Sequence, residues 1–110
     1  MEITYANNRI SKICTDDKTM RKELGPLRAK ILRERLAQIK FARNLESLRF
    51  DVGRWHELMG DRWGQLACSL DGLIRLIFEP AHEPRPFKPD GGLDWTRITT
   101  VEIIEITDYH

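Results

Sequence analysis

The stretch QLACSLDGLIRLIF, residues 65–78, decides the fold of this chain. Apolar residues dominate both halves of the stretch, and Asp71-Gly72 between them suits a two-residue hairpin turn that needs a positive φ. We therefore predict two antiparallel strands, Gln65 to Leu70 and Leu73 to Phe78.

Side-chain alternation gives the second of these strands two different faces. Ile74, Leu76 and Phe78 form an apolar face that indicates a core against helices. Arg75 then lies on the opposite, open face. A charge in such an apolar strand needs a partner or a concave polar surface.

Three further strands are predicted outside the hairpin: Ile3 to Tyr5, Arg54 to Met59 and Val101 to Ile106. The connection from Pro80 to Thr100 contains four of the chain's five prolines. A connection of this length inside a compact domain indicates a functional or mobile segment, which covers a site or docks a partner through Phe87 and Trp95.

The first half of the chain is typical of helices. Asn7 or Asn8 can cap a first helix, Thr15-Asp16-Asp17 a second, and Gly25-Pro26 separates the second from a third. The third helix, Pro26 to Ala42, carries an apolar stripe at three- and four-residue intervals. A short helical turn follows from Asn44 to Ser47. Helices followed by an antiparallel meander predict an α+β fold, with N-terminal helices packed on a small, mostly antiparallel twisted sheet.

Size and composition limit the classes of protein to which this chain can belong. The chain has 110 residues, 41% of them hydrophobic and 32% charged, which predicts one soluble globular domain over residues 1–110. It contains no run of about 18 apolar residues and no signal-peptide pattern at Met1 to Tyr5, so no membrane span is expected. Cys14 and Cys68 have neither metal-ligand nor redox spacing, which favours a reducing, cytoplasmic location.

Positive charge is concentrated in the first half. Residues 1–53 hold 12 Lys and Arg against 7 Asp and Glu, a net charge of +5, whereas residues 54–110 have a net charge of −4. A local positive face is what nucleic-acid binding needs, although a solvated helix surface explains the same residues. The candidates for RNA contact on the third helix are Arg28, Lys30, Arg33, Arg35 and Lys40.

The sequence lacks the motifs that are typical of several reaction classes. The histidines and cysteines show no close ligand pairing for zinc, so no metal or other cofactor is predicted. There is no Gly-x-Ser-x-Gly elbow and no Walker-type phosphate loop.

The remaining polar groups suit RNA cleavage without metal. In that reaction the 2′-hydroxyl attacks the adjacent phosphate while a base removes its proton and an acid protonates the departing 5′-oxygen. His56 and His110 are the candidate imidazoles, and a guanidinium such as Arg75 stabilises charge on the phosphate. Each of these residues also has a plainer interpretation. His56 can be a surface histidine, His110 can belong to a frayed terminus, and Arg75 can form a structural pair with Asp108 or Glu102.

At these residues the chain resembles the HigB branch of the RelE/ParE toxin superfamily, over nearly its whole length. The matching segments are Cys14-Thr15-Asp16-Asp17, Leu24-Gly25-Pro26, Trp55-His56-Glu57-Leu58, Gly60-Asp61-Arg62, Gly64-Gln65, Arg75-Leu76-Ile77-Phe78-Glu79-Pro80, Glu102-Ile103, Ile106 and Asp108-Tyr109-His110. The resemblance implies ribosome-dependent cleavage of messenger RNA and neutralisation by a HigA-like helix-turn-helix antitoxin. It also implies that His56 and His110 are the acid and base, that Asp108 and Tyr109 orient or shuttle protons, and that Arg75 holds phosphate.

The chain departs from the family pattern at Met59, where relatives usually have a lysine, and at Trp63 and Leu66, which flank Gly-Gln. With Met59 at this position, the predicted site lacks the positive charge of the lysine, and Arg54 or Arg62 can supply a positive charge in its place. Because of this loss, an alternative is a non-nucleolytic protein on the same fold, such as a ParE-like topoisomerase poison or a degenerate toxin kept as a partner-binding module.

Overall fold

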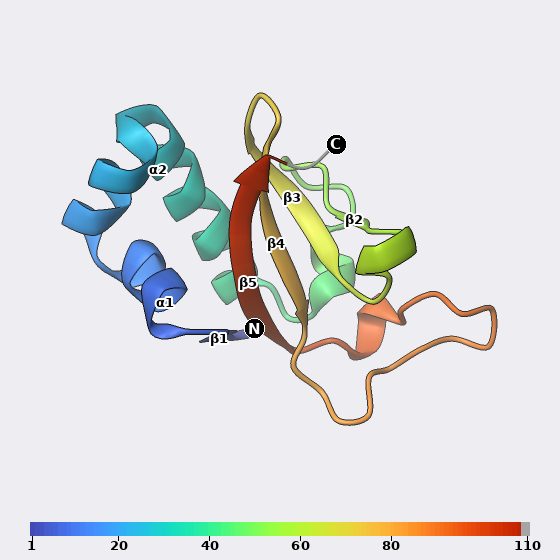
Figure 1. The fold of residues 1–110 in the computed structure, drawn as a ribbon. Helices are drawn as coiled ribbons and strands as arrows, with labels where there is room; N and C mark the ends of the chain where they lie inside the picture. The colour runs from blue at the N-terminus through green and yellow to red at the C-terminus, as the bar shows by residue number, and fades with distance from the viewer. Residues whose placement is uncertain (109–110) are drawn as a thin grey trace.

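The computed structural model describes residues 1–108, so the candidate site residues Tyr109 and His110 lie outside the described part. Two helices pack against one face of a five-stranded sheet (Figure 1), which confirms the predicted α+β architecture. The elements in chain order are β1 (Glu2–Tyr5), α1 (Asn8–Thr15), α2 (Asp17–Phe41), the 3-10 turn η1 (Leu45–Leu48), β2 (His56–Glu57), η2 (Gly60–Arg62), β3 (Leu66–Asp71), β4 (Ile74–Pro80), η3 (Trp95–Arg97) and β5 (Thr100–Asp108).

The sheet has the strand order β1-β5-β4-β3-β2. β1 runs parallel to β5, and the other pairs are antiparallel, so the predicted mostly antiparallel sheet is confirmed. In the β3–β4 hairpin the register shifts between Ser69 and Asp71. This shift takes up one residue, so the connection consists of Gly72 and Leu73, one position later than predicted, and Gly72 has φ +54°.

The predicted strand from Arg54 to Met59 is wrong in length, because only His56 and Glu57 pair with β3. At one end Arg54 has φ +53°, a left-handed conformation that ends an extended strand. At the other end the chain turns into η2 directly after Met59.

Side-chain caps set the helix starts. Asn7 Oδ1 accepts from Ile10 N at 2.9 Å, and Asp16 Oδ2 accepts from Thr19 N at 3.1 Å. The hydrogen bonds from the side chain and backbone of Thr19 lower the pKa of the Asp16 carboxyl. α2 continues to Phe41 across a non-helical Gly25 with φ +81°, which is the break that Gly25-Pro26 predicts.

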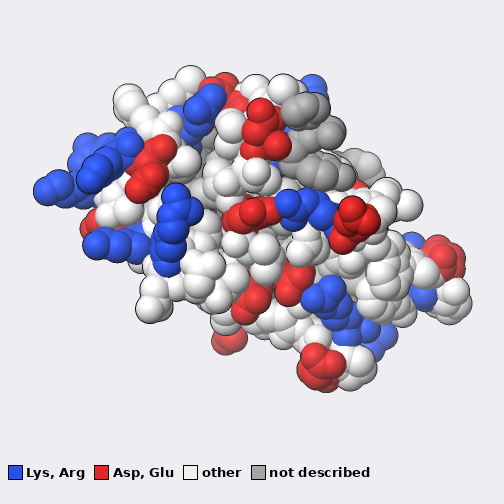
Figure 2. Space-filling view, viewed as in Figure 1, with Lys and Arg blue, Asp and Glu red and all other residues white. Residues whose placement is uncertain are grey.

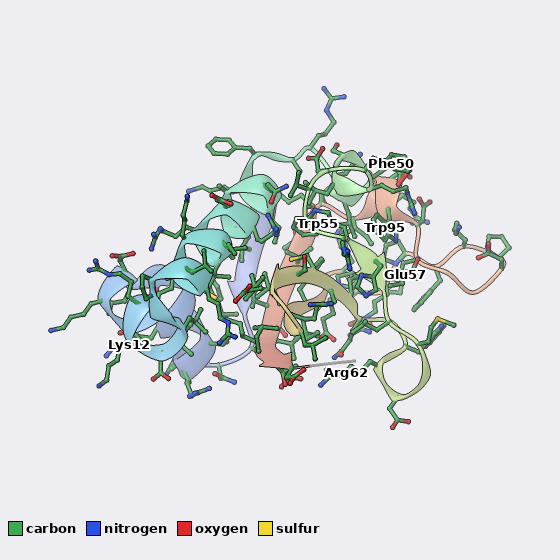
Figure 3. All side chains as sticks on the ribbon, turned by 90° about the horizontal axis from the view of Figure 1, so that it is seen from above. Lys12, Phe50, Trp55, Glu57, Arg62 and Trp95 are labelled. Atoms are coloured by element: carbon green, nitrogen blue, oxygen red, sulfur yellow. The ribbon has the colours of Figure 1, made fainter. Side chains whose placement is uncertain are left out.

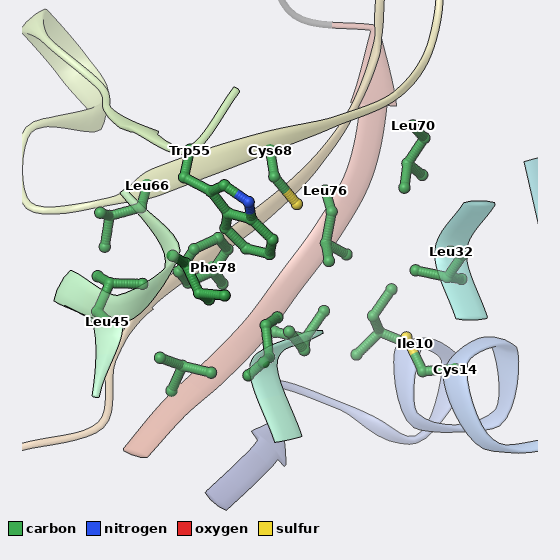
Figure 4. Packing of buried hydrophobic residues seen from close by; sticks show 14 of the residues in the cluster. Ile10, Cys14, Leu32, Leu45, Trp55, Leu66, Cys68, Leu70, Leu76 and Phe78 are labelled. Carbon is green, nitrogen blue, oxygen red and sulfur yellow. The ribbon is translucent and has the colours of Figure 1, made fainter. Parts of the chain in front are cut away.

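The core lies between the helices and the sheet (Figure 4). It joins Leu32 of α2 to Leu76 and Phe78 of β4, with the Trp55 ring edge-on to Phe78 at 5.9 Å between centroids. A smaller cluster of Leu58, Ala67, Ile77 and Ile104 covers part of the other face of the sheet. Among the described residues no helix is long and apolar enough to cross a membrane.

Candidate functional site

The face of the sheet away from the helices carries the predicted polar residues in two rows. His56, Ala67, Ile77 and Glu105 are partners in one row across four strands. Ser69, Arg75 and Thr107 form the next row, about 7 Å further along the strands. With strands about 4.8 Å apart, the Cα atoms of His56 and Arg75 are separated by about 12 Å, close enough for their side chains to contact one ligand.

Arg54 and Arg75 line one shallow depression of about 360 Å³ at the hairpin end of the sheet, together with Ser69, Leu70, Asp71 and Gly72. Ser69 N donates to Gly53 O at 2.7 Å, which brings the neighbouring Arg54 to the row of Arg75. Arg75 Nη1 donates to Gly72 O at 2.7 Å, a backbone contact that fixes the guanidinium at the rim. The two guanidinium groups outnumber the one carboxylate of the depression, that of Asp71, so the site has a net positive charge that suits a phosphate.

His56 is exposed, and its ring is oriented by the turn before β2. Its Nδ1 lies 2.6 Å from Arg54 O. A carbonyl oxygen can only accept a hydrogen bond, so Nδ1 carries the proton of the neutral ring. Nε2 is then the unprotonated nitrogen, which is the state that a general base needs.

Arg62 ties η2 to the sheet. It forms an ion pair with Glu105 of β5, and its Nη1 donates to Gln65 Oε1 at 3.0 Å. Through Arg62, η2 is therefore tied to the row that contains His56 and Glu105. Arg62 is thus joined to the row of His56 and Glu105, which is the row next to that of Arg75.

β5 brings Thr107 to the same open face and ends beside the start of β4. Thr107 is the register partner of Arg75, and Asp108, which is exposed, is the partner of Ile74. The strand extends two residues beyond the predicted end at Ile106. Asp108 therefore lies beside the start of β4, and strand alternation places its side chain on the face of Ile74, opposite to that of Thr107 and Arg75.

The cations of α2 lie in different environments. Lys30, Arg33 and Lys40 are exposed, and Figure 2 shows Lys and Arg gathered over the helices at the left of the molecule. Arg28 Nε lies 3.4 Å from Asp71 Oδ2, so α2 contributes a third arginine next to the depression.

Arg35 is different, because only 8% of it is exposed. Its Nε donates to Ser69 O at 2.8 Å and its Nη1 to Gln38 Oε1 at 3.1 Å. A Cβ on Gly53 would lie 2.9 Å from Arg35 Nε, so glycine is needed for the backbone to approach this side chain. The guanidinium of Arg35 therefore faces into the protein and joins α2 to β3.

Glu57, for which the sequence indicates no role, anchors the connection from Pro80 to Thr100. Its two carboxylate oxygens accept hydrogen bonds from Leu93 N and Trp95 Nε1, each at 3.0 Å. Figure 3 shows Glu57 and Trp95 close together in space. Trp95 is buried, and Arg49 lies over its ring at 4.0 Å. The expectation that Trp95 docks a partner is therefore wrong, and the connection is held by a buried tryptophan rather than presenting it.

Cys14 and Cys68 are both buried free thiols. Burial raises the pKa of the Cys14 thiol to about 12, and it raises the pKa of the Cys68 thiol further still. Within residues 1–108, no group of three His, Cys, Asp or Glu side chains is arranged to hold a metal ion.

Solved structures of other proteins have a similar fold. No protein-family model and no curated protein sequence matches the chain. Among solved structures, it is similar to a YoeB/ParE toxin from Agrobacterium tumefaciens, with a TM-score of 0.61 and 9% identity over 100% of both chains. It is also similar to the YoeB dimer from Staphylococcus aureus, with a TM-score of 0.56, 15% identity, and coverage of 100% of this chain and 97% of that one. The chain therefore has the fold of YoeB/ParE-type toxins.

Proposed function

We propose that this chain is the toxin of a type II toxin–antitoxin pair, of the HigB type, and that it cleaves messenger RNA on the ribosome without a metal ion. One observation carries the proposal: the depression with Arg54 and Arg75 and the exposed imidazole of His56 share the open face of the sheet. The likeness to YoeB/ParE-type toxin folds supports the same class of protein.

Each part of the cleavage reaction has a candidate group. His56 Nε2 takes the proton from the 2′-hydroxyl, and the 2′-oxygen attacks the adjacent phosphorus. Arg75 and Arg54 bind the phosphate oxygens as negative charge builds on them. His110 protonates the departing 5′-oxygen, with Asp108 and Tyr109 orienting it, and the products are a 2′,3′-cyclic phosphate and a 5′-hydroxyl.

Ribosomal RNA is the proposed contact of the exposed α2 cations, Lys30, Arg33 and Lys40, with Arg28 at the edge of the depression. Arg35 is left out of this set because its guanidinium is buried against Ser69 O. Arg62 acts in this scheme by holding η2 against Glu105, next to the row of His56. The proposed partner is a HigA-like helix-turn-helix antitoxin, and the proposed location is the cytoplasm, where ribosomes and reduced thiols occur together.

The test is controlled expression in bacteria with mapping of RNA 5′ ends. Wild-type protein should create new ends within translated codons. His56→Ala should slow cleavage by about 10²- to 10⁴-fold and Arg75→Ala by about 10²- to 10³-fold. Arg97→Ala is the matched control, because Arg97 is exposed on η3 outside this site. Full cleavage by Arg75→Ala would contradict its role in binding phosphate.

A second candidate is a non-nucleolytic protein on the same fold, such as a ParE-like topoisomerase poison or a degenerate toxin. Met59 favours it, because this side chain is 73% exposed and places a thioether where the family resemblance expects a cation. DNA-damage signalling with intact messages, in the same expression experiment, would support the poison. Growth without either effect would support a partner-binding module.

A further inference from the structure

Trp63 is an exposed aromatic side chain held in a fixed orientation. It is 56% exposed, whereas Trp55 and Trp95, the other tryptophans of the chain, are only 5% and 3% exposed. Its ring stacks on Phe87, with 4.6 Å between the ring centroids and 6° between the ring planes. Phe87 covers one face of the indole, so the exposed surface belongs to the other face and the edge.

The backbone around Trp63 keeps the ring in place. Trp63 N donates to Gly60 O at 3.0 Å and Gln65 N to Arg62 O at 2.9 Å, which closes two successive tight turns. Gly64 has φ +91°, and a Cβ there would lie 2.8 Å from Arg85 Nη1. Because the ring is ordered before any ligand arrives, binding costs little side-chain entropy.

We propose that Trp63 is a stacking platform for an unpaired base of single-stranded RNA. Every base has a π-face, and an ordered aromatic ring binds it without reading sequence. A cation lies beside the platform: Arg85, which forms an ion pair with Glu79 at 3.0 Å, packs against Gly64. Lys88, the residue after Phe87, forms an ion pair with Asp90 at 3.5 Å. The choice of RNA as the ligand rests on the proposed function.

The size of the platform favours one base over a docked protein. The large apolar side chains exposed at η2 are those of Met59 and Trp63. One aromatic side chain buries about 150–250 Å² when covered. A stable protein interface buries about 800 Å² on each partner. Met59 and Trp63 together bury well under that area when covered.

The platform lies at the other end of the sheet from the two-arginine depression. The depression includes Gly72 of the β3–β4 hairpin, whereas Trp63 comes three residues before β3 begins, at the end of that strand away from the hairpin (Figure 1). His56 lies between them along the strand direction. The stacked base therefore belongs to a different nucleotide from the one at the phosphate site, and the platform positions the strand along the open face.

Tryptophan fluorescence measures this binding directly, because Trp63 is the exposed one of the three. The probe is a short 2′-O-methyl oligoadenylate, which cannot react through its 2′-oxygen. We expect it to quench and shift the Trp63 emission, and an abasic oligomer of the same length to quench much less. Measured by fluorescence anisotropy of a labelled probe, Trp63→Ala should weaken binding roughly 5- to 150-fold, while Trp63→Phe keeps most of it.

Phe50→Ala is the matched control, because Phe50 is also an exposed aromatic residue but lies outside η2. It should bind the oligomer like the wild type. Equal binding by Trp63→Ala and wild type, or equal quenching by the abasic oligomer, would overturn the platform. If translated messages are still cleaved in that case, the nuclease function stands without the platform. If the platform binds RNA and no message is cleaved, the proposed function fails and the platform stands.

Discussion

Replacing Arg35 by leucine separates the interior role of this residue from an RNA-binding role. The substitution removes the Nε bond to Ser69 O at 2.8 Å and the Nη1 bond to Gln38 Oε1 at 3.1 Å. A hydrogen bond from a charged group contributes about 1.5–3 kcal/mol, and leucine restores part of the lost packing. We expect the free energy of unfolding to fall by about 3 kcal/mol.

Urea unfolding followed by circular dichroism gives the measurement. With an m-value of about 1.5 kcal/mol/M, the midpoint of Arg35→Leu should fall by about 2 M. Arg33→Leu is the matched control on α2, because Arg33 is exposed and its ion pair with Asp17 lies at the surface. This control should change stability by less than about 1 kcal/mol. An unchanged midpoint for Arg35→Leu, together with weaker RNA binding, would refute the interior role.

Three further predictions concern other parts of the fold. Cys14 and Cys68 should react with a thiol reagent only after unfolding, because burial raises both thiol pKa values; rapid reaction of the native protein would contradict their placement. Glu57→Leu should lose about 2–4 kcal/mol of stability and expose Trp95 to acrylamide, because both carboxylate acceptors disappear, while the conservative Glu57→Gln should lose less. The Asp16 pKa is lowered on folding, so its ionised form stabilises the protein above the ordinary aspartate pKa, and this contribution disappears as pH falls through the folded pKa. The stability difference between wild type and Asp16→Asn should therefore shrink below about pH 4, and a difference that stays constant with pH would argue against the cap.

Local signals in the sequence predict most of the fold. Asn7, Asp16 and Gly25-Pro26 act through neighbouring backbone groups, so their effects can be inferred from a few adjacent residues. The alternation in β4 also predicts correctly that Leu76 and Phe78 face the helices and that Arg75 does not.

Features that depend on distant contacts are not predictable in the same way. Arg35 belongs to a basic helix by sequence, and only its packing against β3 and Gly53 reveals that it is buried. The late start of β2 depends on the left-handed conformation of Arg54, and arginine is a residue type that seldom adopts a positive φ. Glu57 looks like an ordinary surface carboxylate until Leu93 and Trp95 are brought to it from the other end of the chain.

For the candidate site, the sequence identifies residue types and the structure adds their placement. It brings Arg54 and Arg75 to one depression, pairs Arg75 with Thr107, and joins Arg62 to Glu105 in the neighbouring row. Trp63 has no sequence signal for stacking, because its partner Phe87 lies in the proline-rich connection.

The chemical nature of the cut RNA ends tests the central claim most directly. Purified protein, ribosomes and a translated message should yield fragments that end in a 2′,3′-cyclic phosphate and begin with a 5′-hydroxyl. A message with a single 2′-deoxy substitution at the cleaved nucleotide should resist cutting there, because the attacking oxygen is absent. Fragments that begin with a 5′-phosphate, or equal cutting of the 2′-deoxy message, would contradict attack by the 2′-hydroxyl on this face of the sheet.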